Sequence, residues 1–212
     1  VFRFNFRHEK NQKILYLHGG YNTLQPSPFH WRLLDKLTLN TLHEVVLPIY
    51  PKSPDYHYLE TFKAIRDVYN QLVEEVGADN IVMMGDGSGG GLALSFVQSL
   101  INDNQEVPRK LFLLSPLLDA TLTNPNITQT LEENDILVSR FGVHQLMKSW
   151  ANDLPLSDAR ISPLYGTLKG LPPIYMYGGG REILSPDMHV FTHALEAVSY
   201  THLRAHETRG NL

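Results

Sequence analysis

The sequence contains no cysteine among its 212 residues. Disulfide bonds, thiolate metal sites and thiol nucleophiles are therefore excluded. The chain also lacks a large excess of one charge, with 18 Lys and Arg against 22 Asp and Glu and a formal net charge of −4. Nucleic acids and anionic membranes attract clustered positive charge, so we expect neither of them as the main partner.

Long hydrophobic runs are absent as well. The longest nearly uninterrupted apolar stretch, residues 111–118, is far shorter than the about 20 residues that span a bilayer. No secretory signal is visible, but the chain starts at Val1 rather than at Met, so the missing signal carries little weight. We expect a cytoplasmic protein. The hydrophobic fraction of 42% and the charged fraction of 19% are typical of one globular domain with a substantial core.

Two periodicities alternate along the chain. Short apolar or alternating runs typical of strands occur at residues 1–6, 13–18, 44–49, 80–84, 110–114 and 173–177. Helical spacing of apolar residues occurs after residue 27 and at residues 58–76, 92–100, 141–150 and 186–197. This order predicts an N-terminal hairpin followed by a largely parallel sheet with helices on both faces. Such sheets bind ligands at the carboxyl ends of their strands.

The first loop at such a strand end contains His18-Gly19-Gly20. Glycines have no Cβ, so their backbone N–H groups can approach a ligand closely. Two such donors can stabilise a developing oxyanion, which is often worth about 3 kcal/mol per donor. The alternative is an ordinary glycine turn beside a buried histidine, because glycine pairs mark turns in many proteins.

The second loop, GDGSGGG at residues 85–91, lies between a predicted strand and a predicted helix. This setting is typical of a nucleophile elbow and also of phosphate binding at a helix N-terminus. A P-loop would need Lys and Ser or Thr after the last glycine, where this chain has Leu92 and Ala93. The spacing G-x-G-x-x-G also fits a dinucleotide site, but no acidic partner residue can be placed.

The third loop, GGGRE at residues 178–182, continues to Asp187. The carboxylate of Glu182 or of Asp187, just past a strand end, could orient a catalytic histidine. The alternative is a carboxylate that only stabilises the start of a helix, where acidic residues are common.

The three loops together resemble the alpha/beta-hydrolase fold, specifically the hormone-sensitive-lipase-like esterases, also called the GDXG or alpha/beta hydrolase 3 group. The motifs that carry the resemblance are ILYLHGGY at residues 14–21, VMMGDGSGGGLAL at residues 82–94 and SPLYGTLKGLPPIYMYGGGREILSPD at residues 162–187. The chain resembles the acetyl-esterase-like proteins of staphylococci and related bacteria. The resemblance implies a three-layer α/β sandwich with a mostly parallel sheet, truncated at both ends.

This resemblance implies hydrolysis of small carboxylic esters by a serine, an acid and a histidine, without a metal or another cofactor. The serine attacks the ester carbonyl, the histidine takes its proton, and the carboxylate holds the histidine in one tautomer. Gly19 and Gly20 match the oxyanion-hole glycines of the family. Glu182 matches its catalytic acid, and Asp187 matches a nearby acidic position.

The nucleophile motif departs from the family pattern G-D-S-A-G-G. An alignment without a gap places Gly87 at the nucleophile position and Ser88 at the alanine position. If the turn is slipped by one residue, Ser88 becomes the nucleophile and the N–H of Gly89 completes the oxyanion hole. Without the slip, the N–H of Ser88 does so. We take Ser88 as the candidate nucleophile.

The C-terminal residues 198–212 differ from the rest of the chain and resemble the in-frame translation of a transposon-type sequencing adapter. We therefore expect residues 1–197 to be an incomplete hydrolase domain and residues 198–212 to be an artefact tail. His202 and His206 would then carry no chemistry.

The family histidine lies beyond the helix predicted at residues 186–197, where this chain enters the tail. We expect His189 and His193, inside that helix, to be solvated or packed rather than catalytic. Loss of the last strand would leave the edge of the sheet uncovered.

Two functions remain at this point. The leading hypothesis is a cytoplasmic, metal-independent carboxylesterase that uses Ser88 on short-acyl or acetyl esters and is inactive in this truncated form. The alternative is a non-catalytic ligand-binding or regulatory protein whose nucleophile position is occupied by Gly87. We expect residues 119–157 to form part of the pocket wall. Phe141 and Trp150 are candidate linings, although core packing is the commoner role of such aromatics.

Overall fold

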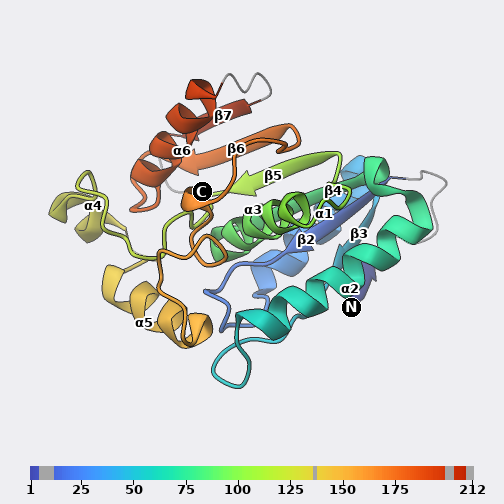
Figure 1. The fold of residues 1–212 in the computed structure, drawn as a ribbon, viewed down its shortest axis with the longest axis horizontal. Coiled ribbons are helices and arrows are strands. Elements are labelled where there is room, and N and C mark those ends of the chain that lie inside the picture. Colours follow the sequence, from blue (N-terminus) through green and yellow to red (C-terminus); the bar gives the residue numbers. More distant parts are fainter. Residues whose placement is uncertain (5–11, 136–137, 199–202, 209–212) are drawn as a thin grey trace.

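The structure is a computed structural model that describes residues 1–4, 12–135, 138–198 and 203–208. These residues form a seven-stranded sheet with the strand order β1-β3-β2-β4-β5-β6-β7 (Figure 1). Its first strand pair is antiparallel and the other pairs are parallel. The strands are β1 (Phe2–Phe4), β2 (Lys13–Leu17), β3 (Glu44–Leu47), β4 (Ile81–Asp86), β5 (Lys110–Leu114), β6 (Ile174–Gly179) and β7 (Leu203–Thr208).

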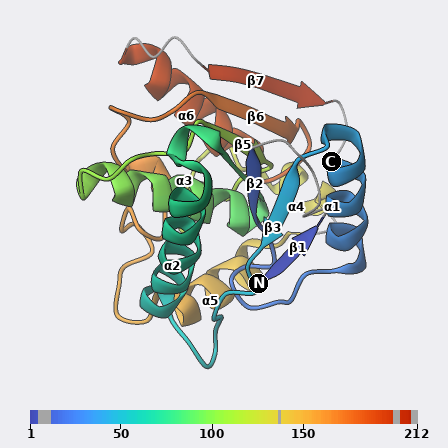
Figure 2. The ribbon, with the colours of Figure 1, turned by 90° about the vertical axis from the view of Figure 1, so that its right-hand side faces the viewer.

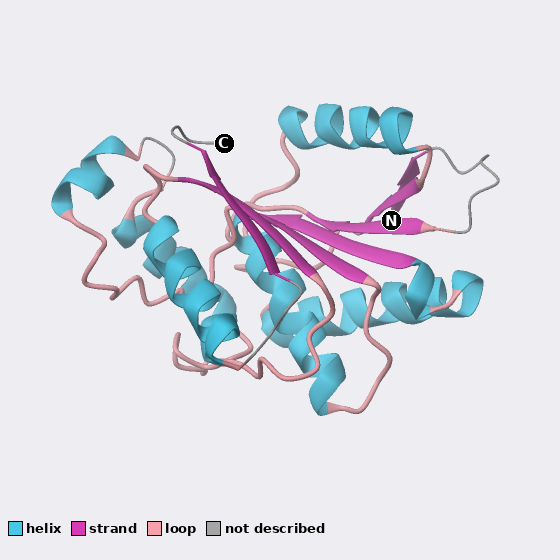
Figure 3. Ribbon diagram, turned by 90° about the horizontal axis from the view of Figure 1, so that it is seen from above, coloured by secondary structure: helices cyan, strands magenta, loops and turns pink. Residues whose placement is uncertain are grey.

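Helices cover both faces of the sheet, as the sequence predicts (Figure 3). The α-helices are α1 (Pro28–Thr41), α2 (Tyr58–Val76), α3 (Gly87–Asn102), α4 (Gln129–Asn134), α5 (Arg140–Ala151) and α6 (Ser185–Ala197). One face packs against α1 through Leu34, and the other packs against α2 and α3 through residues such as Ile65 and Phe96. The short α4 buries none of its residues. It therefore has no apolar stripe from which the sequence could predict a helix.

The predicted N-terminal hairpin is wrong. β1 pairs with β3, in the register Phe2↔Leu47, whereas β2 lies between β3 and β4. After Lys13, the remaining residues of β2 are apolar and buried, and they gain more from a central position, where neighbouring strands and helices cover them on both sides. Residues 5–11, which include the predicted end of the first strand, lie outside the described residues.

Helix α3 begins at Gly87 rather than at residue 92, so most of the glycine run is helical. A Cβ at Gly89 would collide with the carbonyl oxygens of Leu17 and His18. The helix therefore packs its backbone directly on the end of β2, and this close approach requires glycine. Packing rather than ligand binding accounts for this part of the motif.

We expect Gly89→Ala to lower the free energy of unfolding by about 3 kcal/mol or more, because the collision involves backbone atoms that cannot move aside. Gly87→Ala, from the same motif, is the matched control. Its Cβ would meet nothing closer than 4.0 Å, so only the positive φ of 51° opposes it, at about 1 kcal/mol. Urea unfolding of the two variants measures both values, and equal losses would contradict this packing account.

The expectation that the sheet edge beside β6 is uncovered is also wrong. β7, from the C-terminal residues, pairs with β6 along its whole length, from Ile174↔Leu203 to Gly179↔Thr208. It lies at the opposite edge of the sheet from β1 (Figure 2). An edge strand offers unpaired N–H and C=O groups that any extended segment can satisfy, whatever its side chains. The predicted boundary after Ala197 falls between α6 and this strand.

Candidate active site

A cavity of about 710 Å³ lies at the carboxyl ends of the central strands, where the three loops singled out from the sequence meet. Aliphatic and aromatic side chains form much of its wall. The lining residues are Tyr16, Gly19, Gly20, Tyr21, Phe29, His30, Leu33, Asp86, Gly87, Ser88, Leu114, Ser115, Asp135, Val138, Glu182 and Leu184. The parallel topology thus brings together segments more than 150 residues apart, as expected for this class of sheet.

The carboxylate of Asp86 connects the first two loops. Its Oδ1 accepts hydrogen bonds from the Tyr16 hydroxyl (2.8 Å) and from the Gly19 N–H (2.9 Å). Its Oδ2 accepts one from Nε2 of His30 (3.1 Å). Burial alone would raise the pKa of Asp86, but these hydrogen bonds and the nearby His30 outweigh burial and hold the pKa below its usual value. The loop after β2 is therefore fixed against the start of α3.

His30 is a histidine in the cavity wall, but both of its ring nitrogens are engaged. Nδ1 accepts the N–H of Ser27 at 2.9 Å, so Nε2 carries the proton that is donated to Asp86. Through these two hydrogen bonds, the ring joins the residue before α1 to Asp86 at the end of β4. These contacts give His30 a structural role rather than that of a catalytic base.

The turn from β4 into α3 has the backbone of a nucleophile elbow. Gly87 has a φ of 51°, in the left-handed region that side-chain-bearing residues rarely adopt. A Cβ built there would enter open space, since the nearest atom is the Cα of Gly19 at 4.0 Å. A side chain at position 87, beside the cavity that Gly87 lines, would therefore meet no steric obstacle.

Ser88, the predicted nucleophile, lies one residue later, within the first turn of α3. It lines the cavity, but its side chain is buried, and its Oγ accepts the N–H of Tyr21 at 2.7 Å. The serine hydroxyl thus holds the loop after β2, in the manner of a structural residue.

The glycines predicted for the oxyanion hole have different environments. Gly19 and Gly20 line the cavity, but the N–H of Gly19 is donated to Asp86. Gly89 lies outside the lining residues and packs against β2. His18 is fully buried, its Nδ1–H donates to the carbonyl oxygen of Gly19 (2.7 Å), and burial lowers its pKa to about 4. This neutral histidine supports the loop.

Glu182 is the predicted acid that reaches the cavity. It follows β6 in a turn where its N–H donates to the carbonyl oxygen of Gly179 (3.2 Å), and its side chain is buried. The next residue, Ile183, donates its N–H to Oδ2 of Asp135 (3.0 Å), and Oδ1 of Asp135 accepts the N–H of Val138 (3.0 Å). Asp135 therefore joins the acid-bearing turn to the segment between α4 and α5.

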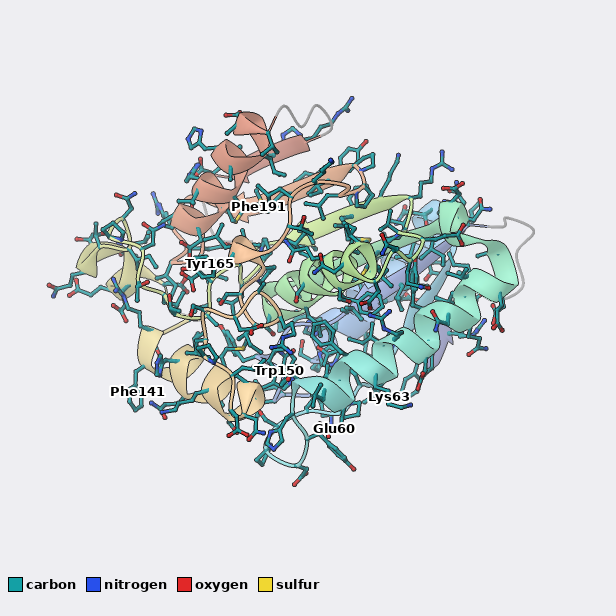
Figure 4. The ribbon with its side chains drawn as sticks, viewed as in Figure 1. Glu60, Lys63, Phe141, Trp150, Tyr165 and Phe191 are labelled. Carbon is teal, nitrogen blue, oxygen red and sulfur yellow. The ribbon has the colours of Figure 1, made fainter. Side chains whose placement is uncertain are left out.

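The sequence does not single out Asp135 as a site residue, because no local pattern around an aspartate in an irregular segment indicates which groups it binds. The expectation that residues 119–157 form part of the wall is confirmed by Asp135 and Val138. The two aromatics named there do not line the cavity. Phe141 is 77% exposed, whereas Trp150 is buried and donates its Nε1–H to Thr61 of α2 at 2.8 Å (Figure 4).

Asp187 is set apart from the cavity, in the first turn of α6. Its Oδ1 accepts a hydrogen bond from Asn124 (2.8 Å), and its side chain is buried. Burial raises the pKa of Asp187 to about 6; the hydrogen bond from Asn124 opposes this, and the nearby Asp119 adds to it. Of the two candidate acids, only Glu182 is in contact with the cavity. The side chains of His189 and His193 on α6 are largely exposed, as predicted.

We expect the pKa of Asp187 to appear in the pH dependence of stability. The fold favours the protonated carboxyl, so the free energy of unfolding falls as pH rises from about 4 to 6 and stays low above that range. Asp187→Asn cannot ionise and should raise the free energy of unfolding at pH 8 by about 1–3 kcal/mol.

Urea unfolding at pH 4 and pH 8 measures this difference. Asp35→Asn, at an exposed position of α1, serves as the control and should change stability by less than about 0.5 kcal/mol at either pH. A gain in Asp187→Asn that is the same at both pH values would show that ionisation of Asp187 is not its cause.

Comparison with known proteins agrees with this geometry. The profile of a family described as "alpha/beta hydrolase fold" matches residues 14–211. A Staphylococcus aureus protein assigned as an esterase has a crystal structure that superposes with a TM-score of 0.93 at 60% sequence identity, covering 97% of this chain and 69% of that one. An esterase from Acinetobacter venetianus is 34% identical over 87% of this chain and 61% of its own length. A triacylglycerol lipase from Mycobacterium tuberculosis is 31% identical over 88% of this chain and 38% of its own length.

The fold and the site define an α/β hydrolase. The chain belongs to the alpha/beta hydrolase family, in its hormone-sensitive-lipase-like group. It spans less than two thirds of the length of these two curated relatives. Within the described ranges, the helices include none that is long and apolar enough to cross a membrane. The same part of the chain contains no cluster of three or more His, Asp or Glu that could hold a metal ion.

Proposed function

We propose that the cavity is the substrate site of a carboxylic ester hydrolase and that it takes short-acyl or acetyl esters. The observation that carries this proposal is the elbow at Gly87, which points into an apolar cavity beside the buried acid Glu182. Relatives named as an esterase and as a lipase support the same reaction class.

The charges in the wall favour a neutral ligand. Asp86, Asp135 and Glu182 line the cavity, and the described lining residues include no lysine or arginine. A free carboxylate or phosphate would place a further acidic group beside these three carboxyl groups, which is costly in a partly desolvated site. A carboxylic ester carries no charge and avoids this cost.

The position of the attacking group follows from the elbow. The side-chain direction at Gly87 enters the cavity, where an ester carbonyl would lie beside the first turn of α3. The N–H groups of that turn can stabilise the negative charge that develops on the carbonyl oxygen. Hydrolysis by this chain would require Ser88 as the nucleophile, and its Oγ would first have to release the N–H of Tyr21.

A second function is favoured by a specific observation. Gly87 supplies no nucleophile, and the hydroxyl of Ser88 is held by Tyr21 in the wall. A protein with this site would bind an ester without cleaving it. We therefore propose ester binding as the property common to both functions, and turnover as the property that separates them.

The absence of cysteine allows a direct test, because one introduced thiol is then the only one in the chain. We expect the thiol of Gly87→Cys to react with iodoacetamide at least about tenfold faster than that of Ser88→Cys. Position 87 faces the cavity, and the N-terminus of a helix stabilises the reactive thiolate. Saturating ethyl butyrate should slow the reaction of Gly87→Cys, since a bound ester covers the thiol. Intact-protein mass spectrometry gives both rates.

Ser149→Cys, at an exposed position of α5, is the control, and its alkylation rate should not respond to the ester. A faster reaction of Ser88→Cys than of Gly87→Cys would overturn the assignment of position 87. Unchanged alkylation of Gly87→Cys with the ester present would overturn ester binding at this site.

A further inference from the structure

The loop after β2 has a backbone conformation that is unfavourable for its residues. Tyr21 has a φ of 55° and Asn22 has a φ of 52°, and Gly20 before them has a φ of 117°. Glycine adopts such values at little cost, whereas consecutive residues with side chains rarely do. This conformation persists only where surrounding contacts hold it.

The N–H and the carbonyl group of Tyr21 are both held by side-chain hydroxyls. The N–H donates to Oγ of Ser88 at 2.7 Å, and the carbonyl oxygen accepts the hydroxyl hydrogen of Thr23 at 3.1 Å. Oγ1 of Thr23 also lies 2.7 Å from Oγ of Ser53. The single hydroxyl hydrogen of Thr23 is donated to Tyr21, so Ser53 is the donor to Thr23. We call these two hydroxyls, of Ser53 and Thr23, the hydroxyl relay.

The segment after β3, at residues 50–53, supports the loop at two further points. The N–H of Ser53 donates to the carbonyl oxygen of Asn22 at 2.9 Å. The hydroxyl of Tyr50 donates to the carbonyl oxygen of His18 at 2.6 Å. All four residues are buried, so these hydrogen bonds are shielded from water.

The environment of Ser88 depends on the position of Tyr21. Ser88 lines the cavity but is only 3% exposed, and its Oγ accepts the N–H of Tyr21. Release of this N–H removes only one of the two hydroxyl contacts of Tyr21. The relay still holds the carbonyl oxygen and therefore opposes movement of the loop away from Ser88.

We propose that Thr23 and Ser53 are positioning residues that act on Ser88 through Tyr21. Their hydroxyl relay keeps Tyr21 in the left-handed conformation, with its N–H on Oγ of Ser88, and so keeps that hydroxyl engaged and buried. Opening of the relay lets the loop relax and exposes Ser88 to the cavity. The inference specifies the regulation of the proposed ester site, and its consequence for ester hydrolysis rests on that proposed function.

Hydrogen exchange of the Tyr21 amide, followed by NMR, tests the relay directly. Thr23→Val replaces one hydroxyl by a methyl group, and Ser53→Ala removes the other. Each change should lower the protection of the Tyr21 amide about fivefold, which corresponds to the net contribution of one hydrogen bond. Thr23→Ser keeps the hydroxyl and should retain the protection.

Thr192→Val is the matched control. Thr192 is a half-buried threonine of α6, like Thr23 in exposure, and its hydroxyl donates to the carbonyl oxygen of Met188 at 2.9 Å. The control therefore removes a hydrogen bond of the same kind outside the loop. It should change the protection of the Tyr21 amide by less than about twofold, because local opening of the loop does not involve this bond.

Alkylation of Ser88→Cys by iodoacetamide reports whether the relay controls access to position 88. Adding Thr23→Val or Ser53→Ala to Ser88→Cys should make the reaction about fivefold faster, and adding Thr192→Val should not change it. The thiol of Gly87→Cys should react at nearly the same rate with or without these changes, since a side chain there meets no steric obstacle.

The proposal is overturned if either readout is the same in Thr23→Val and Ser53→Ala as with the relay intact. It is also overturned if Thr192→Val has an equal effect, because a general loss of stability would then explain both readouts. The ester site is tested separately, by the protection of Gly87→Cys with ethyl butyrate while the relay is intact. Failure of that protection with a responsive relay would overturn the ester site alone.

Discussion

The carboxylate of Asp86 ends the central strand β4 and joins three parts of the molecule at the position where the cavity forms. It receives hydrogen bonds from β2 through Tyr16, from the following loop through Gly19, and from α1 through His30. Each of these groups donates a hydrogen, and the hydrogen bonds keep the carboxyl ionised at a lower pKa than usual. Without this acceptor, donors from all three parts would lose their partner at once, including the buried hydroxyl of Tyr16.

The same hydrogen bonds help to fix the shape of the turn at Gly87. The turn at Gly87 is held by Asp86 before it, by Ser88 bound to Tyr21 after it, and by the Leu117 N–H that donates to the Gly87 carbonyl oxygen (2.8 Å). Backbone and neighbouring side chains thus define the direction in which a side chain at position 87 would point. Gly87 itself contributes no side chain to the cavity that it lines.

Much of the fold could be predicted from local sequence patterns. Residues 58–76 have the apolar periodicity of one long helix, and α2 has these bounds because that stripe packs on the sheet. The pairing of β1 with β3 could not be predicted, since strand pairing depends on which partners bury the most surface across the whole sheet. The start of α3 was placed too late because glycine is a poor helix former in general, whereas here Gly89 allows the helix to touch β2.

For the candidate site, too, some features could be predicted from local sequence patterns and others could not. The loops at residues 18–21, 85–91 and 178–182 could be found because several glycines directly after an apolar strand indicate a tight turn or a close approach of the backbone. The partners within the site could not be found. The Gly19 N–H donates to Asp86, and Asp135 holds the turn of Glu182. Both contacts join segments that lie far apart in the chain. The direction of a side chain at position 87 or 88 likewise could not be predicted, because it depends on the backbone geometry of the turn.

The central claim is that position 87, and not Ser88, presents its side chain to a bound ester. The most direct test is reaction of the unmodified protein with a fluorophosphonate, followed by peptide mass spectrometry to locate any adduct, with an active serine esterase of the same family as the positive control. We expect Ser88 to stay unmodified while the control is labelled fully. A stoichiometric adduct on Ser88 would contradict the claim and would establish the slipped elbow, with Ser88 as its nucleophile.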